Sequence, residues 1–244
     1  MSPALAVYKR EFKAYFASPL AAVFIVIFLL LASAFTFYFG GFFEAGQADL
    51  QSFFRFHPWL YLLLVPAIAM GLWADERKSG TLELLLTQPI TLWQAVLGKF
   101  FAAWTFLALA LALSFPIWIT VAWLGDPDHG VILASYLGSL LMAGAFLAIG
   151  GCLSAATRSQ VLAFILAVLV CLLFLLAGFP LALDPLRPFL SQHAIDAVSA
   201  LSFLTHFQSI LRGVLDLRDV LYFVLTIVAW LIATVLVIEI RKAD

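Results

Sequence analysis

Long apolar runs, separated by short polar connections, dominate the chain. A helix needs about 20 apolar residues to cross a hydrocarbon core of about 30 Å. Six runs meet that length, at residues 19–43, 57–74, 98–124, 131–156, 160–182 and 219–240. Polar and apolar positions do not alternate within the runs, and backbone groups in lipid must bond within their own segment. The pattern predicts an all-α polytopic membrane protein, one domain with six transmembrane helices.

Composition supports this prediction. The chain has 244 residues, of which 65% are hydrophobic and 11% charged, and its mean hydropathy is +1.10. A soluble domain is about half apolar and about a quarter charged. The net charge of −1 gives no reason to expect a nucleic-acid partner.

Basic residues are distributed unequally between the two sides of the predicted bundle. With the N-terminus inside, nine fall on the inner side: Lys9, Arg10, Lys13, Arg77, Lys78, Lys99, Arg158, Arg241 and Lys242. Four fall outside: Arg55, Arg187, Arg212 and Arg218. Lys and Arg concentrate in short cytoplasmic loops, so we expect both termini in the cytoplasm.

Ionisable residues are almost absent from the predicted spans, where Glu239 lies near one end. Ion-coupled transporters place carboxylates, His or Arg at mid-membrane depth, because those groups carry the coupling. The pattern therefore disfavours secondary active transport, although a channel or a structural subunit would be equally apolar.

The N-terminal segment, residues 2–17, has the pattern of an amphipathic helix, with Ser2 as N-cap and Pro3 in its first turn. Its apolar residues recur at spacings of three and four: Leu5, Tyr8, Phe12, Tyr15 and Phe16. Basic residues lie opposite: Lys9, Arg10 and Lys13. We expect this helix to lie on membrane lipid at the inner interface, as an anchor or as part of a partner-docking surface.

A charged insert, residues 75–98, separates the second and third runs. "DERKSG" ends on a glycine, so we expect the chain to leave the membrane there. A short helix should follow with Thr81 as N-cap, and three leucines share one face of it: Leu82, Leu85 and Leu86. Pro89 cannot continue that helix, and Thr91 with Gln94 forms a capping box that starts the next.

Two interpretations of this insert remain. It is either a long loop lying on the headgroups or a docking element. Two separately capped helices, one with a leucine face held outside the membrane, favour a partner that covers the leucines.

The outer segment before the last run, residues 183–218, is too long for a turn. It predicts two short amphipathic helices, broken near "LTHF" and ending near Gly213, that enter the outer leaflet without crossing it. His206 lies at their junction, where a hydrogen-bonding role is commoner than a ligand role.

Signatures of catalysis are missing from the sequence. It contains no G-x-x-x-x-G-K-[ST], no G-x-S-x-G and no H-E-x-x-H. "GDPDHG", residues 125–130, is a weak metal motif, and Cys152 and Cys171 lie inside apolar runs as buried hydrophobes. We expect no catalytic residue, no metal site and no cofactor bound by this chain, which is therefore not predicted to be an enzyme.

Four stretches taken together resemble one family. They are "YKREFKAYFASP" near the N-terminus, "DERKSGTLELLLTQPITLWQAVLGK" from residue 75, "SAATRSQ" from residue 154 and "LSFLTHFQSILRGVLDLRDVLYF" from residue 201. They are similar to ABC-2-type transporter permeases, particularly the small six-span branch of gliding-motility and nitrous-oxide-reductase-maturation permeases.

The resemblance implies a role for each special segment. ATPase-coupling residues would be Glu76, Arg77, Ser79, Gly80, Thr81, Leu82, Glu83, Leu85 and Leu86. The interfacial N-terminal helix would act through Tyr8, Lys9, Arg10, Phe12 and Lys13. The outer re-entrant segment would include Thr205, His206, Phe207, Arg212, Gly213 and Asp216.

It also implies partners. The chain would pair with a second permease copy or a related permease and with two copies of a cytoplasmic ATPase, which would bind ATP and Mg²⁺. The expected location is a bacterial cytoplasmic (inner) membrane. Three hypotheses remain at this stage: an exporter subunit, a subunit that passes ATPase work to a periplasmic partner without transport, and a structural anchor.

Overall fold

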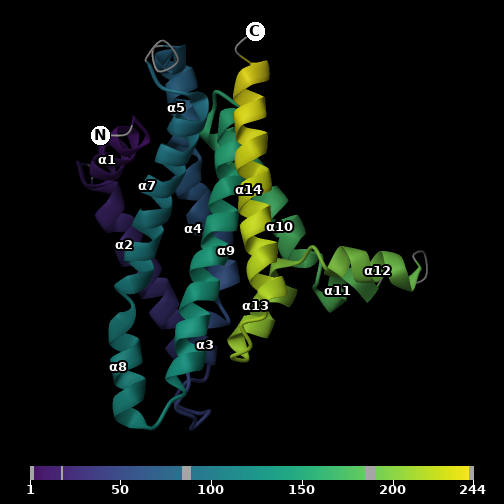
Figure 1. Ribbon diagram of the computed structural model, residues 1–244. Helices are drawn as coiled ribbons and strands as arrows, with labels where there is room; N and C mark the ends of the chain where they lie inside the picture. Colours follow the sequence, from purple (N-terminus) through teal and green to yellow (C-terminus); the bar gives the residue numbers. More distant parts are fainter. Residues whose placement is uncertain (1–2, 18, 84–88, 185–190, 242–244) are drawn as a thin grey trace.

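The computed structural model describes residues 3–17, 19–83, 89–184 and 191–241, and every regular element in these ranges is a helix (Figure 1). In chain order the elements are α1 Pro3–Ala17, α2 Leu20–Ala34, the π-helix η1 Phe35–Phe39, α3 Gln51–Phe54, α4 His57–Ala69, α5 Gly71–Ser79, α7 Leu92–Ala112, α8 Phe115–Leu124, α9 His129–Ala155, α10 Gln160–Leu176, α11 Pro180–Leu183, α12 Gln192–Ser199, α13 Phe203–Leu211 and α14 Leu217–Ile240. The prediction of an all-α polytopic membrane protein is confirmed.

Five helical stretches in the described ranges are long and apolar enough to cross a membrane: Ala21–Phe39, His57–Ser79, Leu92–Leu124, His129–Ala155 and Leu217–Ile240. The fifth predicted span contains α10, which has 17 residues and stands at the lower limit for crossing. A sixth apolar stretch combines α12 and α13, which are bent by 66° against each other. Among the described residues, five helices are thus long and apolar enough to cross a membrane, or up to six if the bent pair is one span.

Helix α9 forms the centre of the bundle and packs against α4, α7, α10, α13 and α14. Small residues allow this close packing. A Cβ on Gly150 would lie 2.5 Å from the Cβ of Ala69 in α4, and one on Gly138 would lie 2.8 Å from Ile210 in α13. Glycine at these positions lets neighbouring backbones approach α9 closely.

The second span is broken where α4 meets α5, after Pro66 within α4. Ser154 of α9 bridges the break: its hydroxyl donates to the carbonyl of Met70 at 2.7 Å. The same oxygen accepts from the backbone amides of Trp73 at 3.1 Å and Ala74 at 3.0 Å. A side chain from the central helix thereby satisfies backbone groups that the break leaves open.

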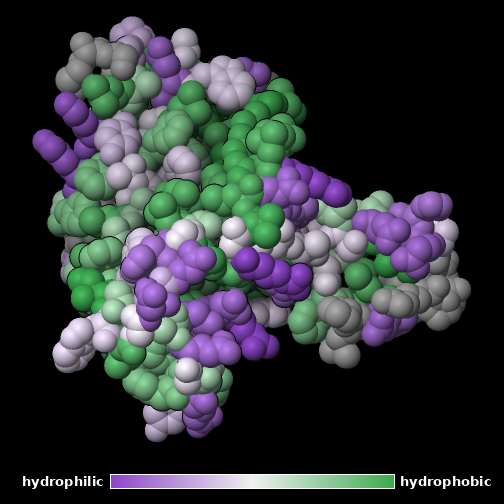
Figure 2. Space-filling view, turned by 60° about the horizontal axis from the view of Figure 1, so that its bottom comes forward, coloured by the Kyte–Doolittle hydropathy of each residue, from purple (hydrophilic) through white to green (hydrophobic). Residues whose placement is uncertain are grey.

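Both termini lie at one end of the bundle, here called the terminal end, and the opposite end is called the distal end (Figure 1). Helices α11 and α12 project sideways from the bundle as an arm, and α13 returns to pack on α9 and α14. Figure 2 shows hydrophilic and hydrophobic surface side by side on this arm, as the amphipathic pattern predicts.

Candidate coupling site

The charged stretch after the second span is helical. We expected the chain to leave the membrane at "DERKSG". Helix α5 continues through this stretch to Ser79 and ends where Gly80 adopts φ +72° and ψ 5°. That left-handed conformation at a helix end suits glycine, which has no Cβ to clash. The charged residues therefore extend from the second span on a rigid helix.

Two side chains of α5 tie it to the bundle. Arg77 donates from Nη1 to the carbonyl of Ala155, the last residue of α9, at 2.8 Å. A cation at this position complements the partial negative charge of the helix end. Gln160, the first residue of α10, donates from Nε2 to Asp75 Oδ1. The α5 helix is thus held by the ends of two spans.

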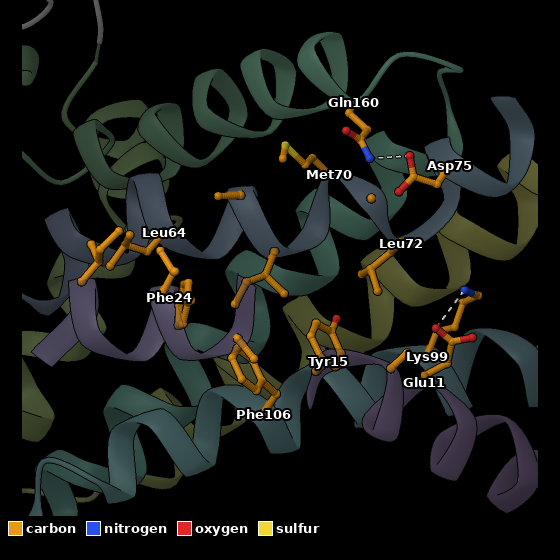
Figure 3. A pocket seen from close by; sticks show the side chains of 17 residues that line it. Glu11, Tyr15, Phe24, Leu64, Met70, Leu72, Asp75, Lys99, Phe106 and Gln160 are labelled. Atoms are coloured by element: carbon orange, nitrogen blue, oxygen red, sulfur yellow. Dashed lines mark hydrogen bonds and ion pairs between the residues drawn. The ribbon is translucent and has the colours of Figure 1, made fainter. Parts of the chain in front are cut away.

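A buried lysine connects α5 with α7 and α1. The Lys99 side chain is 4% exposed, and its Nζ lies 2.9 Å from Glu76 Oε1 and 3.3 Å from Glu11 Oε2. The ammonium also lies 5.2 Å from the ring centroid of Trp73. Arg10 Nη2 lies 2.7 Å from Glu11 Oε1 and 3.9 Å from Glu76 Oε1. We call these four charged residues the Lys99 cluster; Figure 3 shows its Lys99–Glu11 pair.

The face of α1 that packs on the bundle differs from the predicted apolar face. A Cβ on Gly98 of α7 would lie 2.8 Å from Val7, and the rings of Tyr15 and Phe106 stack with centroids 4.8 Å apart. Val7, Glu11 and Tyr15 follow one another at i, i+4 and i+8, so they lie on one face. Burial, and then the nearby Glu11 carboxylate, raise the pKa of Tyr15.

The predicted residues of the N-terminal helix flank this face. Tyr8 and Phe12 are half-buried and stack with centroids 5.8 Å apart. Lys9, Arg10 and Lys13 are exposed, which agrees with a basic polar side. Sequence reasoning missed Glu11, the one acidic residue among these bases, which lies on the packed side. Its isolated charge on a helix otherwise basic was the available signal.

The other predicted coupling residues lie at the tip of α5 and just beyond it. Four of them are exposed: Ser79, Gly80, Thr81 and Glu83. Thr81 is already helical and its hydroxyl lies 2.8 Å from Ser79 Oγ, so it does not occupy the N-cap position that we predicted.

The predicted leucine face is described only in part. Leu82 is 8% exposed and belongs to the hydrophobic core, so our prediction of an exposed leucine at this position is wrong. Because α5 does not leave the bundle at its charged stretch, Leu82 stays within reach of the core. Leu85 and Leu86 lie outside the described residues. The capping box of Thr91 and Gln94 is confirmed at the start of α7.

The segment from α12 to the start of α14, residues 192–219, is here called the distal segment and has its own buried polar pair. His206 Nδ1 lies 2.6 Å from Asp219 Oδ1, and its Nε2 donates to the carbonyl of Ala200 at 2.9 Å. The predicted hydrogen-bonding role of His206 is confirmed. The helix break comes earlier than predicted, because Ser202 caps α13 by accepting from the amide of Leu204 at 3.1 Å.

The remaining predicted residues of this segment surround the pair. Thr205 is exposed and Phe207 is buried on α13. Arg212 is exposed, Gly213 has φ +84° after the end of α13, and Asp216 caps α14 by accepting from the amide of Arg218. Asp128 of the "GDPDHG" turn likewise caps α9, and no metal-binding group of three His, Cys, Asp or Glu occurs in the part of the chain described.

A cavity of about 460 Å³ lies beside the Lys99 cluster, between α1, α2, α4, α5, α7 and α10. Figure 3 shows its two contrasting parts. Glu11, Asp75, Lys99 and Gln160 make its polar end, whereas aromatic and aliphatic side chains such as Phe24 line the rest. The cavity therefore carries charge on the side where α5 and α1 meet.

The helices define a polytopic membrane protein whose second span continues into a charged helix that is tied to the ends of α9 and α10. A family model described as ABC-2 family transporter protein matches residues 5–240, and the chain belongs to this family. It is thus a permease subunit of an ABC transporter, a membrane component that works with an ATPase partner rather than an enzyme itself. No match was found among curated proteins.

Proposed function

We propose that this chain couples ATP hydrolysis by a separate cytoplasmic ATPase to export of a substrate across a bacterial inner membrane. The single observation that supports coupling at this site is that the helical second span, bridged at its break by Ser154, continues through Ser79 and is followed by the exposed Gly80, Thr81 and Glu83. A surface carried on a helix continuous with a span can move that span when a partner pushes it.

The partners follow from the same proposal. Two ATPase subunits, each binding ATP and Mg²⁺, would dock on two permease chains, either identical copies or this chain with a related permease. The terminal end would face the cytoplasm, in agreement with the distribution of basic residues. The resemblance to the gliding-motility and nitrous-oxide-reductase-maturation branch remains a prediction.

Docking can be tested by reversing one exposed charge. Glu83→Arg in the complex with the cognate ATPase should reduce both ATPase retention during purification and permease-stimulated ATP hydrolysis. Arg212→Glu is the matched control, because Arg212 is also exposed and ends α13, which lies far from the tip of α5 along the bundle (Figure 1). Unchanged retention and stimulation in Glu83→Arg would show that the ATPase docks elsewhere.

A second variant tests the backbone conformation at Gly80, where α5 ends. Gly80→Pro is incompatible with φ +72°, since proline fixes φ near −65°. It should uncouple hydrolysis more strongly than Gly80→Ala, whose added Cβ would meet nothing within 4 Å.

The projecting arm of α11 and α12 favours one alternative, a subunit that passes ATPase work to a periplasmic partner without transport. Half of the residues of α12 are exposed, including Gln192 and Asp196. Under this alternative, charge reversal at Asp196 abolishes cellular activity while ATP hydrolysis by the purified complex stays unchanged. If the chain instead exports a substrate without such a partner, charge reversal at Asp196 should not abolish cellular activity while ATP hydrolysis stays unchanged.

A further inference from the structure

The Lys99 ammonium is buried where three helices meet. Removing a charge from water costs free energy that only close, well-placed counter-charges offset. Lys99 has two such partners, and they come from segments far apart in the sequence: Glu11 in α1 and Glu76 in α5. Its own helix, α7, begins directly after the charged insert. One side chain therefore meets both segments assigned to partner contact.

We propose that Lys99 is a positioning residue that holds α1, α5 and α7 together as one rigid unit, so that α1 moves with the coupling segment when the ATPase acts. This inference rests on the proposed function and adds to it the residue that transmits motion between the two surface helices. Lys99 itself is buried and is not part of the docking surface.

The packing explains why a charge is needed here. Helix α1 packs extensively on α7 through Val7 and Tyr15 but has little direct packing against α5. Among the contacts of the described residues, α1 and α5 are linked by Lys99 and, at 3.9 Å, by the half-exposed Arg10. Because apolar packing does not join these two helices closely, the ion pairs supply their connection.

The charges of the cluster balance only when Lys99 is present. Two carboxylates, of Glu11 and Glu76, face two cations, Lys99 and Arg10. Glu76 uses Oε1 for both cations, and its buried Oε2 has no hydrogen-bond partner among the described residues. Loss of Lys99 would leave two carboxylates beside one exposed arginine, and their repulsion would separate α1 from α5.

The test uses the full complex of permease and cognate ATPase in lipid nanodiscs. Lys99→Met is compared with Lys99→Arg, which keeps the charge, and with Arg241→Met, which removes an exposed cation at the end of α14. Lys99→Met should lower permease-stimulated ATP hydrolysis at least about fivefold while the Kd for the ATPase changes little, since a coupling free energy is lost and not the docking surface. Lys99→Arg should retain most of the stimulation, and Arg241→Met all of it.

A distance measurement separates transmission from general stability. Spin labels at Ala14 and Lys78, both exposed, report the separation of α1 and α5 after Cys152 and Cys171 are replaced by Ala. With Lys99 the separation should be the same with and without ATP. With Lys99→Met it should broaden and change on ATP binding.

A neutral variant covers the case in which Lys99→Met folds poorly. Glu11→Gln with Lys99→Met and Glu76→Gln leaves no unpaired buried charge, so it should fold. We expect it to remain uncoupled, because the connection is still missing. Full stimulation in this triple variant, or in Lys99→Met, would overturn the proposal. Failure of the unaltered permease to bind or stimulate the ATPase would instead overturn the proposed function.

Discussion

Two regions of the molecule hold a buried nitrogen-bearing side chain beside an acidic one, yet they differ in what they connect. At the terminal end, Lys99 joins α1, α5 and α7, whose contributing residues lie far apart in the sequence. In the distal segment, His206 joins α13 to the start of α14 and to the end of α12, all within one short stretch of chain.

The difference indicates different mechanical roles. The distal pair closes a local structure, and the ring of His206 also stacks on Tyr222 with centroids 3.9 Å apart. The Lys99 cluster fixes the relative position of separate helices, two of which present exposed residues at the terminal end. A disturbance at the terminal end should therefore spread through the bundle, whereas one at the distal pair should stay local.

The largest expected effect on stability comes from Lys99→Met. Two partly buried carboxylates lose their shared counter-charge, which should lower the free energy of unfolding by about 3–5 kcal/mol. Unfolding by SDS in mixed micelles measures this change. The neutral triple variant described above should recover most of the loss. If Lys99→Met were as stable as the unaltered protein, the cluster would not be a structural connection.

A smaller and more local effect is expected from His206→Gln. The variant weakens the contact with Asp219 and with the Ala200 carbonyl, and a lost hydrogen bond to a charged group costs about 1.5–3 kcal/mol. Hydrogen exchange should increase in α12, α13 and the first turns of α14 but not in α5. Equal exchange at the two ends would contradict the distinction between them.

The smallest expected effect is that of Ser154→Ala. It removes the hydroxyl that bridges the break between α4 and α5, and should cost about 1–3 kcal/mol. Because the break lies at the base of α5, spin labels on α5 and α9 should show a broader distance distribution. Ser209→Ala is a suitable control, since Ser209 lies on the distal α13. An unchanged distribution in Ser154→Ala would show that the break is held by packing alone.

The sequence predicts those features that depend on neighbouring residues. The apolar runs correspond to helices, Thr91 and Gln94 form their capping box, and His206 makes hydrogen bonds as expected. Each of these follows from local periodicity, from a cap motif or from the few options of a buried polar group.

Features that depend on contacts between distant segments could not be predicted in this way. The Lys99 cluster takes its charges from three helices, so no spacing in the sequence reveals it. The charges of "DERKSG" predicted an exit from the membrane, but they did not reveal that the ends of α9 and α10 hold this stretch as part of α5. For the same reason the burial of Leu82 was missed.

The position of the coupling site is tested most directly by finding which end of the permease contacts the ATPase. A photo-crosslinking amino acid placed at Glu83 in the complex should link to the ATPase subunit, and the same group at Arg212 should not. Both positions are exposed, so reactivity alone does not distinguish them. A crosslink at 212, or none at 83 in a complex that hydrolyses ATP, would contradict the assignment of the coupling site.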